Sequence, residues 1–224
     1  MKKIAHFLLV VVSIAFVTQS YAQKRYVIKN GFALGGGLTQ FEIITDNFDT
    51  TASNGWLVNA SATGDLPHKW YNISYGMQIS ENNLEVSGLH FNEGVFTEQQ
   101  LEYKVFAAQL SMLLHAKAIK NLLTIDFGPM LQYNGKLELQ SEDQDNLFLS
   151  LDNNTFAAVE LEDISQFNVN GAVGATLGFR FIKLRAQYIY GFTNMLNKLN
   201  DKDLISEKFK GNQSMLTFAA LITF

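Results

Sequence analysis

The stretch FNVNGAVGATLGFRF, residues 167–181, decides the fold class of this 224-residue chain. Its odd-numbered positions hold Phe, Val, Ala and Leu with one Gly, whereas its even-numbered positions hold Asn, Thr, Arg and small residues. Alternation with a period of two is typical of a β-strand whose two faces meet different surroundings. The stretch therefore predicts a strand with one apolar face and one polar or small face.

Seven further segments alternate in the same way, some of them more weakly: residues 32–39, 56–63, 71–80, 105–114, 123–133, 182–193 and 214–224. No stretch after the N-terminal region holds 18 consecutive apolar residues, so a helical membrane span is not expected. The sequence predicts eight strands, most of them close to the length of about 9–11 residues with which a tilted strand crosses a bilayer.

The predicted connections differ between the two ends of the strands. They are short near residues 64–68, 116–120 and 181–182, and long near residues 45–54, 81–99, 136–163 and 196–212. This asymmetry is the plan of outer-membrane barrels, and side chains fill the interior of a barrel of eight strands. We expect an all-β fold: an eight-stranded antiparallel up-and-down transmembrane β-barrel with short periplasmic turns and long extracellular loops. A soluble lipocalin-like barrel, apolar inside, is the alternative.

The first 22 residues have the layout of a secretory signal peptide. Lys2 and Lys3 precede an apolar run over residues 4–17, and Ser20 and Ala22 supply the small residues of a cleavage site. We expect residues 1–22 to be a cleaved signal peptide and residues 23–224 to form the barrel domain in the outer membrane of a Gram-negative cell. An uncleaved N-terminal anchor is the alternative.

The composition excludes several classes of protein. Because the chain has no Cys, disulfide scaffolds and thiolate metal sites are ruled out. A net charge of −4 argues against a basic surface for nucleic acid. The 47% hydrophobic content argues against disorder. We expect no nucleic-acid partner and no cofactor.

Aromatic residues gather toward the ends of the predicted strands, as in the girdles that mark the two membrane interfaces of such barrels. These interface aromatics are Tyr71, Phe179 and Phe181 at the short-turn side, and Tyr133, Tyr190 and Phe192 at the long-loop side.

The chain ends in an apolar strand that finishes on Phe224. The residues that share its face are Leu216, Phe218, Ala220 and Ile222. A terminal Phe with this spacing is similar to the signal that the barrel insertion machinery reads, since such a strand offers an open edge for pairing. We expect this machinery, outer-membrane lipid and lipopolysaccharide to be partners.

Three segments resemble the PorT-like outer-membrane β-barrel family of Bacteroidetes: FGPML at residues 127–131, GAVGATLGFRF at 171–181 and LRAQYIYGFTN at 184–194. The resemblance implies a small porin-like barrel, and most members have no assigned activity. The family takes its name from a protein that helps to deliver secreted proteins to the cell surface. Pro129 removes a ladder hydrogen bond, so we expect a local bulge there.

Four charged residues share the predicted inward face near the short-turn end: Asp126, Arg180, Lys183 and Arg185. Unpaired charge is costly in a narrow lumen, so these side chains are expected to pair with one another as a structural cluster. A polar plug or gate is the functional alternative.

The segment 137–163 is strongly acidic. It contains Glu138, Glu142, Asp143, Asp145, Asp152, Glu160, Glu162 and Asp163 but no Lys or Arg. Its spacing does not fit the EF-hand pattern, so we expect no defined metal site but a solvated acidic face, or one that shares divalent ions with lipopolysaccharide. Apolar residues between the acids suggest a hairpin above the membrane that offers a binding surface.

Catalysis is not expected. His68 and His115 fall at the short-turn side, and His90 lies in a predicted long loop with Ser87 as the nearest Ser. A Ser–His pair must lie within hydrogen-bond reach, and no spacing links these residues.

The sequence therefore predicts a structural or interaction role at the cell surface, with a surface or secretion partner and support of protein secretion or assembly as the finer hypothesis. A narrow porin or small-solute channel is the first alternative, and an outer-membrane lipid-modifying enzyme is the second.

Overall fold

The computed structural model describes residues 28–92, 95–119, 122–140, 147–151, 154–179, 181–202 and 208–224. The expected signal peptide at residues 1–22 lies outside the described residues. Among them, no helix is long and apolar enough to cross a membrane.

Eight long strands make up the wall of the described fold. They are β1 (Lys29–Thr45), β2 (Thr50–Asp65), β3 (Tyr71–Asn92), β4 (Val95–Ile119), β5 (Leu123–Leu139), β8 (Phe167–Phe179), β9 (Ile182–Gly191) and β10 (Gly211–Thr223). Between β5 and β8 the chain forms a short hairpin of β6 (Phe148–Leu151) and β7 (Asn154–Ala157), followed by the 3-10 helix η2 (Ala158–Glu162). A second 3-10 helix, η3 (Asn197–Lys202), precedes β10.

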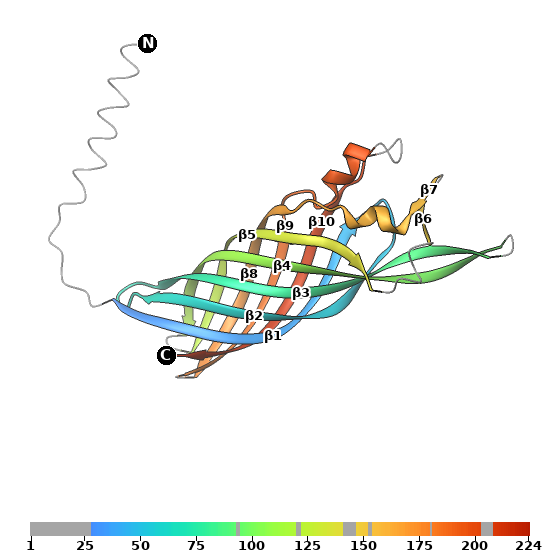
Figure 1. Cartoon of the computed structure of the whole chain (residues 1–224). Coiled ribbons are helices and arrows are strands. Elements are labelled where there is room, and N and C mark those ends of the chain that lie inside the picture. The colour runs from blue at the N-terminus through green and yellow to red at the C-terminus, as the bar shows by residue number, and fades with distance from the viewer. Residues whose placement is uncertain are drawn as a thin grey trace, which may run out of the picture.

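The wall closes into a ring (Figure 1). Each wall strand pairs antiparallel with the next one along the chain, and β10 pairs with β1 from Ala33↔Thr223 to Thr45↔Gly211. Closure gives every wall strand two neighbours, which removes the exposed sheet edges that would invite pairing with other chains. The predicted eight-stranded antiparallel up-and-down barrel is confirmed within the described residues.

The two ends of the barrel differ. The end that holds Phe224 has the connections around residues 66–70, 120–122 and 180–181, and is called here the short-turn end. The opposite end carries η2, η3 and the β6–β7 hairpin and is called the cap end. There the β3–β4 hairpin projects beyond the other strands (Figure 1).

Two of the predicted long connections are wrong. The connection between β1 and β2 is only residues 46–49, and β3 and β4 continue as strands through the predicted loop at residues 81–99. The reason is a change in polarity along β3: the inward face changes from polar to apolar, and the outward face from apolar to polar. Near its start Met77 faces outward and Gln78 is buried inward, whereas farther along Leu84 is buried inward and Glu85 faces outward.

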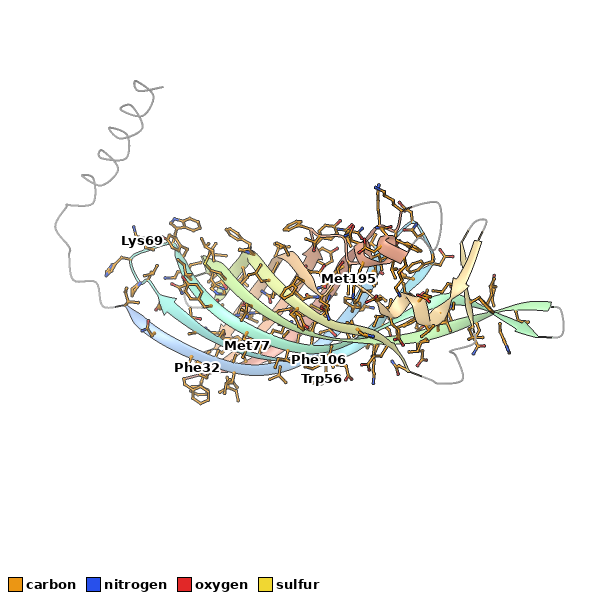
Figure 2. The ribbon with its side chains drawn as sticks, turned by 45° about the horizontal axis from the view of Figure 1, so that its top comes forward. Phe32, Trp56, Lys69, Met77, Phe106 and Met195 are labelled. Carbon is orange, nitrogen blue, oxygen red and sulfur yellow. The ribbon has the colours of Figure 1, made fainter. Side chains whose placement is uncertain are left out.

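The outer face near the short-turn end is an apolar belt (Figure 2). Its exposed members include Phe32, Leu34, Leu38, Trp56, Val58, Tyr75, Met77, Phe106, Leu110, Met112, Phe127, Leu131, Val173, Leu184, Phe218 and Ile222. About 10 residues per strand at a rise of about 3.3 Å and a tilt of about 40° give a belt about 25 Å tall. That height matches the lipid-facing band of an outer-membrane barrel.

Pro129 does not cause a bulge, contrary to expectation. The ladder between β4 and β5 passes from Ser111↔Met130 to Leu114↔Phe127 without a change of register, and Pro129 pairs with Gly171 on the other side. The bulge of β5 falls instead between Asn134 and Leu137, where one extra residue opposes β4. The extra residue changes which positions of β5 point inward: Asn134 is buried before the bulge and Leu137 after it. The inward face of β5 therefore also changes from polar to apolar at this level.

The run Gly35-Gly36-Gly37 in β1 serves close packing of the curved wall. A Cβ atom built on Gly37 would lie 1.9 Å from the carbonyl oxygen of Phe218 in β10. Only a residue without a side chain allows the two backbones to approach this closely, so the glycines permit the sheet to close.

Candidate functional site: a polar cluster under a closed lumen

Asp126 is the centre of a buried cluster inside the barrel near the short-turn end. Its side chain is fully buried and accepts hydrogen bonds from His115 Nδ1 at 2.6 Å, from the Thr124 hydroxyl at 2.6 Å and from the Thr176 hydroxyl. Arg185 places its Nε 3.9 Å from Asp126 Oδ2 and donates from the same Nε to Thr176 at 3.1 Å. Four residues on the four strands β4, β5, β8 and β9 therefore surround one carboxylate, which meets the need of a buried charge for partners.

A second bond extends this cluster to β3. The Oγ of Ser74 lies 2.6 Å from His115 Nε2, on the far side of the ring from Asp126. An ionised carboxylate can only accept, so the imidazole donates through Nδ1 to Asp126, and in the neutral ring this tautomer leaves Nε2 to accept from the Ser74 hydroxyl. The order Ser74–His115–Asp126 is that of a Ser-His-Asp triad.

The burial of Ser74 argues against a catalytic role for the row Ser74–His115–Asp126. Its side chain is only 1% exposed, and it lies deeper in the lumen than His115. A substrate carbonyl must come within contact distance of a nucleophilic oxygen, which this arrangement does not allow. The row holds three strands in register through buried hydrogen bonds.

Sequence reasoning missed Ser74 and His115 as members of this cluster. Extending the alternation of their strands would have put both side chains on the inward face. The pairs Asn72↔His115 and His115↔Asp126 bring them together, and such pairing is a property of register. The sequence of a single strand does not specify this register.

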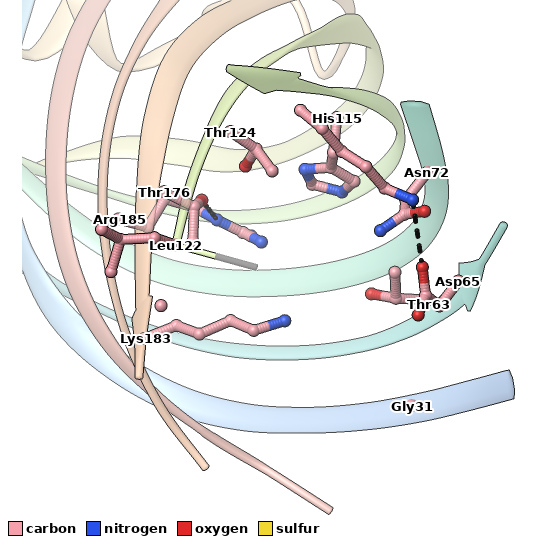
Figure 3. Close-up of a pocket in the computed structure, with 12 residues that line it drawn as sticks. Gly31, Thr63, Asp65, Asn72, His115, Leu122, Thr124, Thr176, Lys183 and Arg185 are labelled. Atoms are coloured by element: carbon pink, nitrogen blue, oxygen red, sulfur yellow. Dashed lines mark hydrogen bonds and ion pairs between the residues drawn. The ribbon is translucent and has the colours of Figure 1, made fainter. Parts of the chain in front are cut away.

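A cavity of about 460 Å³ lies at the short-turn end of the lumen, next to the cluster. Lys183 and Arg185 reach into it from β9, facing His115, Asn72 and Thr63 on the opposite wall (Figure 3). At its rim, Lys117 Nζ lies 3.3 Å from Asp65 Oδ1 and donates to the Leu66 carbonyl at 2.8 Å.

The structure places three of the four predicted interior charges together. Asp126 and Arg185 are buried in the cluster, and Lys183 is half-buried in the cavity beside them. Arg180 lies outside the described residues. His115, which the sequence reading set aside, lies between Asp126 and Ser74.

The predicted interface aromatics lie on the outer face. Phe179, Phe181, Tyr133, Tyr190 and Phe192 are exposed and Tyr71 is half-exposed. Several have an aromatic neighbour: Tyr71 contacts Trp70, Tyr133 contacts Phe167, and Tyr190 contacts Phe192, with ring centroids 5.0–6.1 Å apart.

The C-terminal residues that resemble an insertion signal also face outward. Phe218, Ala220, Ile222 and Phe224 are exposed, and Leu216 is half-buried. In the closed barrel the backbone of Phe224 is paired, because its N–H donates to the Phe32 carbonyl at 2.8 Å.

Above the cluster, a layer of amides crosses the lumen. Gln132 is its centre: its Oε1 accepts from Gln109 and Asn170, and its Nε2 donates to Asn134 and Gln213. Gln78 donates to Gln109 at 2.8 Å, so the layer joins β3, β4, β5, β8 and β10. Its members are almost fully buried.

An apolar core fills the barrel above this amide layer. It consists of buried residues from the upper strands and the cap, including Phe41, Ile43, Leu84, Val86, Leu101, Leu137, Leu149, Leu161, Leu196, Leu199 and Phe209. Tyr103 joins it to the cap through a hydrogen bond from its hydroxyl to the Ala158 carbonyl at 2.8 Å. Protein interiors packed in this way exclude water.

Ion pairs connect the two 3-10 helices of the cap. Lys198 is bonded to Asp163, and Lys202 lies 2.8 Å from Glu160 and 3.6 Å from Asp163. The hydrogen bond from Lys198 holds the pKa of Asp163 below its ordinary value, and the bond to Glu160 raises the pKa of Lys202. These contacts fix η2 against η3 over the barrel mouth.

The acidic segment 137–163 is therefore partly neutralised. Besides Glu160 and Asp163, Glu138 is paired with Lys104 at 3.5 Å, and the predicted hairpin is present as β6 and β7. Glu142, Asp143, Asp145 and Asp152 lie outside the described residues. Within the described part of the chain, no group of three His, Cys, Asp or Glu side chains is arranged to hold a metal ion.

The fold and the two faces of the wall define a class. A closed ring of eight antiparallel strands, apolar outside and polar inside over one continuous belt, is the architecture of outer-membrane β-barrels.

No family model matches the chain, and no curated protein matches it. Among solved structures, it is similar to that of Neisserial surface protein A (NspA), with 10% identity over 86% of this chain and 97% of that chain and a TM-score of 0.46. It is also similar to the outer membrane protein OprG from Pseudomonas aeruginosa, with 9% identity over 88% and 97% and a TM-score of 0.47.

Proposed function

We propose that this chain is an outer-membrane β-barrel that does not conduct and that has a structural or interaction role at the cell surface. The observation that carries the proposal is the closed lumen. A path along the barrel axis would meet the amide layer around Gln132 and then the apolar core above it.

The apolar belt supports a membrane location. An unbroken outer face of large exposed hydrophobic side chains would be an aggregation hazard in water, whereas lipid tails bury it without cost. The polar outer face above the belt, which includes Glu98, Gln99 and Glu102, then faces an aqueous compartment. With the short turns on the periplasmic side, that compartment is the cell exterior.

The cap end supports an interaction role. Strands β3 and β4 continue well past the belt, and Leu84, Val86 and Leu101 pack in the apolar core, so the base of the projecting hairpin is held in place. A rigid surface loses little conformational entropy when it binds a partner. Support of protein secretion or assembly, as the resemblance to the PorT-like family implies, is the finer form of this proposal.

Conductance separates this proposal from a channel. The purified barrel in planar bilayers is expected to give no single-channel steps with salts or small solutes, and a conducting porin added to the same bilayer serves as the control. Regular steps with a reproducible size would overturn the closed-lumen proposal.

A deletion strain tests the role. Cells that lack this chain are expected to lose surface delivery of one or more secreted proteins, and the intact gene is expected to restore it. A variant in which residues 91–96 are replaced by Asn-Gly should fold, as judged by heat-dependent gel migration, but fail to restore delivery. Normal delivery in the deletion strain would overturn the secretion role.

The Ser74–His115–Asp126 row favours a hydrolase as the second candidate, although the burial of Ser74 opposes it. A fluorophosphonate probe labels activated serines covalently. We expect no labelling of the purified barrel; labelling that disappears in Ser74→Ala would establish the second candidate instead.

A further inference from the structure

We propose that the cavity at the short-turn end binds a carboxylate group, held by Lys183 and Arg185. The cavity has the size of a small-ligand site, about 460 Å³ against the several hundred Å³ that such sites usually occupy. It is lined mainly by polar and charged side chains at the mouth of a lumen whose other end is closed.

Lys183 is the first argument for an anion. Its side chain extends from β9 into the cavity (Figure 3), and it makes no hydrogen bond or ion pair with another described residue. A half-buried ammonium without a direct ion-pair partner pays a desolvation cost that a bound anion removes. Lys117, by contrast, is already paired with Asp65 and bonded to a carbonyl.

Arg185 is the second argument. Only its Nε makes a hydrogen bond to another described residue, the one to Thr176, so both terminal nitrogens of the guanidinium remain as donors. The side chain is 8% exposed and reaches toward the centre of the cavity (Figure 3). A planar fork with two free nitrogens matches the two oxygens of a carboxylate.

The acceptors near Arg185 are already used. Asp126 accepts from His115, Thr124 and Thr176, which occupies most of the acceptor sites of its two oxygens. Gln187 is the next residue of β9 that points inward after Arg185. Its side chain is 4% exposed, and its Nε2 has no partner among the described residues. The inner side of β9 therefore offers several donors for which the described chain supplies no acceptor.

Charge balance favours an anion of one negative charge. Among the described side chains around the cavity, the three cations Lys117, Lys183 and Arg185 face the two anions Asp65 and Asp126. One net positive charge remains on these five side chains. A carboxylate neutralises it, whereas a phosphate dianion would leave an excess of negative charge.

The experiment uses the full barrel refolded in detergent micelles and isotopically labelled for NMR. Butyrate and butyramide are titrated as a matched acid and neutral amide, and the peptide Ala-Ala-Ala is compared with its C-terminal amide. Inorganic phosphate, titrated at an alkaline pH at which the dianion predominates, is the doubly charged anion. Saturable shifts of the amides around residues 183–187 are expected with butyrate and with the peptide acid, and with neither amide.

The two acids identify the source of the group. A lower dissociation constant for Ala-Ala-Ala than for butyrate would assign the cavity to a peptide C-terminus, and the reverse order to a free small carboxylate. Equal shifts with the amides, no saturation with either acid, or tighter binding of phosphate than of butyrate would overturn the carboxylate proposal.

Variants locate the site. Lys183→Met is expected to weaken binding of butyrate at least tenfold and to leave the folded barrel intact, as judged by heat-dependent gel migration. Lys136→Met removes an exposed Lys at the cap end and is the matched control, expected to bind like the native chain. Arg185→Met supplements these only where it folds, because Arg185 is also paired with Asp126. Unchanged binding in Lys183→Met would overturn the site, whether or not the barrel conducts or supports secretion.

Discussion

His115 Nδ1 lies 2.6 Å from Asp126 Oδ1, on two neighbouring strands whose register sets these residues directly opposite each other. The pair is 5% and 0% exposed, so the carboxylate depends on protein partners and not on water. With Arg185 on the other side, this relationship fixes three strands of the wall around one buried charge.

Replacing the central carboxylate should destabilise the barrel. Asp126→Asn removes the negative charge and leaves the Arg185 guanidinium buried without a counter-charge, so the free energy of unfolding should fall by about 3 kcal/mol. Urea unfolding in lipid vesicles, followed by the fluorescence of Trp56 and Trp70, measures the change. Asp46→Asn alters an exposed carboxylate and should have little effect. A loss of less than about 1 kcal/mol in Asp126→Asn would speak against the cluster as a structural element.

Replacing the central residue of the amide layer should also destabilise the barrel. Gln132→Leu keeps much of the volume but removes hydrogen bonds to Gln109, Asn134, Asn170 and Gln213 together. Partners left unsatisfied in a buried layer should lower the free energy of unfolding by about 3 kcal/mol in the same assay. Gln40→Leu changes an exposed glutamine and is the control. Equal stability of the two variants would mean that water replaces the layer at little cost.

The cap should loosen in acid. The pKa of Asp163 is lowered, chiefly by the hydrogen bond from Lys198, so its contribution to stability is present above the pKa of an unfolded Asp, about 4, and is lost as the pH falls through the lowered value. Hydrogen exchange of residues 158–164, corrected for the intrinsic rate, should therefore increase below about pH 4.

Lys198 is the residue that tests this pH dependence. In Lys198→Met the cap should already exchange faster at neutral pH and gain little more in acid. Lys104→Met breaks the separate pair with Glu138 and should leave the acid dependence of the cap unchanged. An acid response that persists in Lys198→Met would assign it to another group.

The last residue should matter more for assembly than for the finished barrel. The backbone of Phe224 is paired with Phe32 while its ring is 76% exposed. Phe224→Ala should therefore slow insertion by the purified insertion machinery several-fold and change the unfolding midpoint little. Phe181→Ala removes an exposed aromatic ring at the same end and is the matched control. Equal insertion rates of the two variants would show that only the girdle, and not the terminal position, is read.

The sequence was a good guide to the wall and a poor one to the cap. Alternation over residues 167–181 and its seven counterparts predicted eight strands and the outward face, because burial of one face imposes a local period of two. The reading ended β3 too early because the alternation reverses between Gln78 and Leu84, where lipid outside gives way to water.

What the sequence determined by itself is therefore local: which residues are strand, which side of each strand is apolar, and that Asp126, Lys183 and Arg185 point inward. The tertiary structure decided what those side chains meet. Ser74, His115 and Asp126 are up to 52 positions apart and come together only through the register of three strands. The closed cap likewise depends on contacts between η2 and η3, which are distant in the chain. Register and closure are set by the ring as a whole, so no single segment contains the information that specifies them.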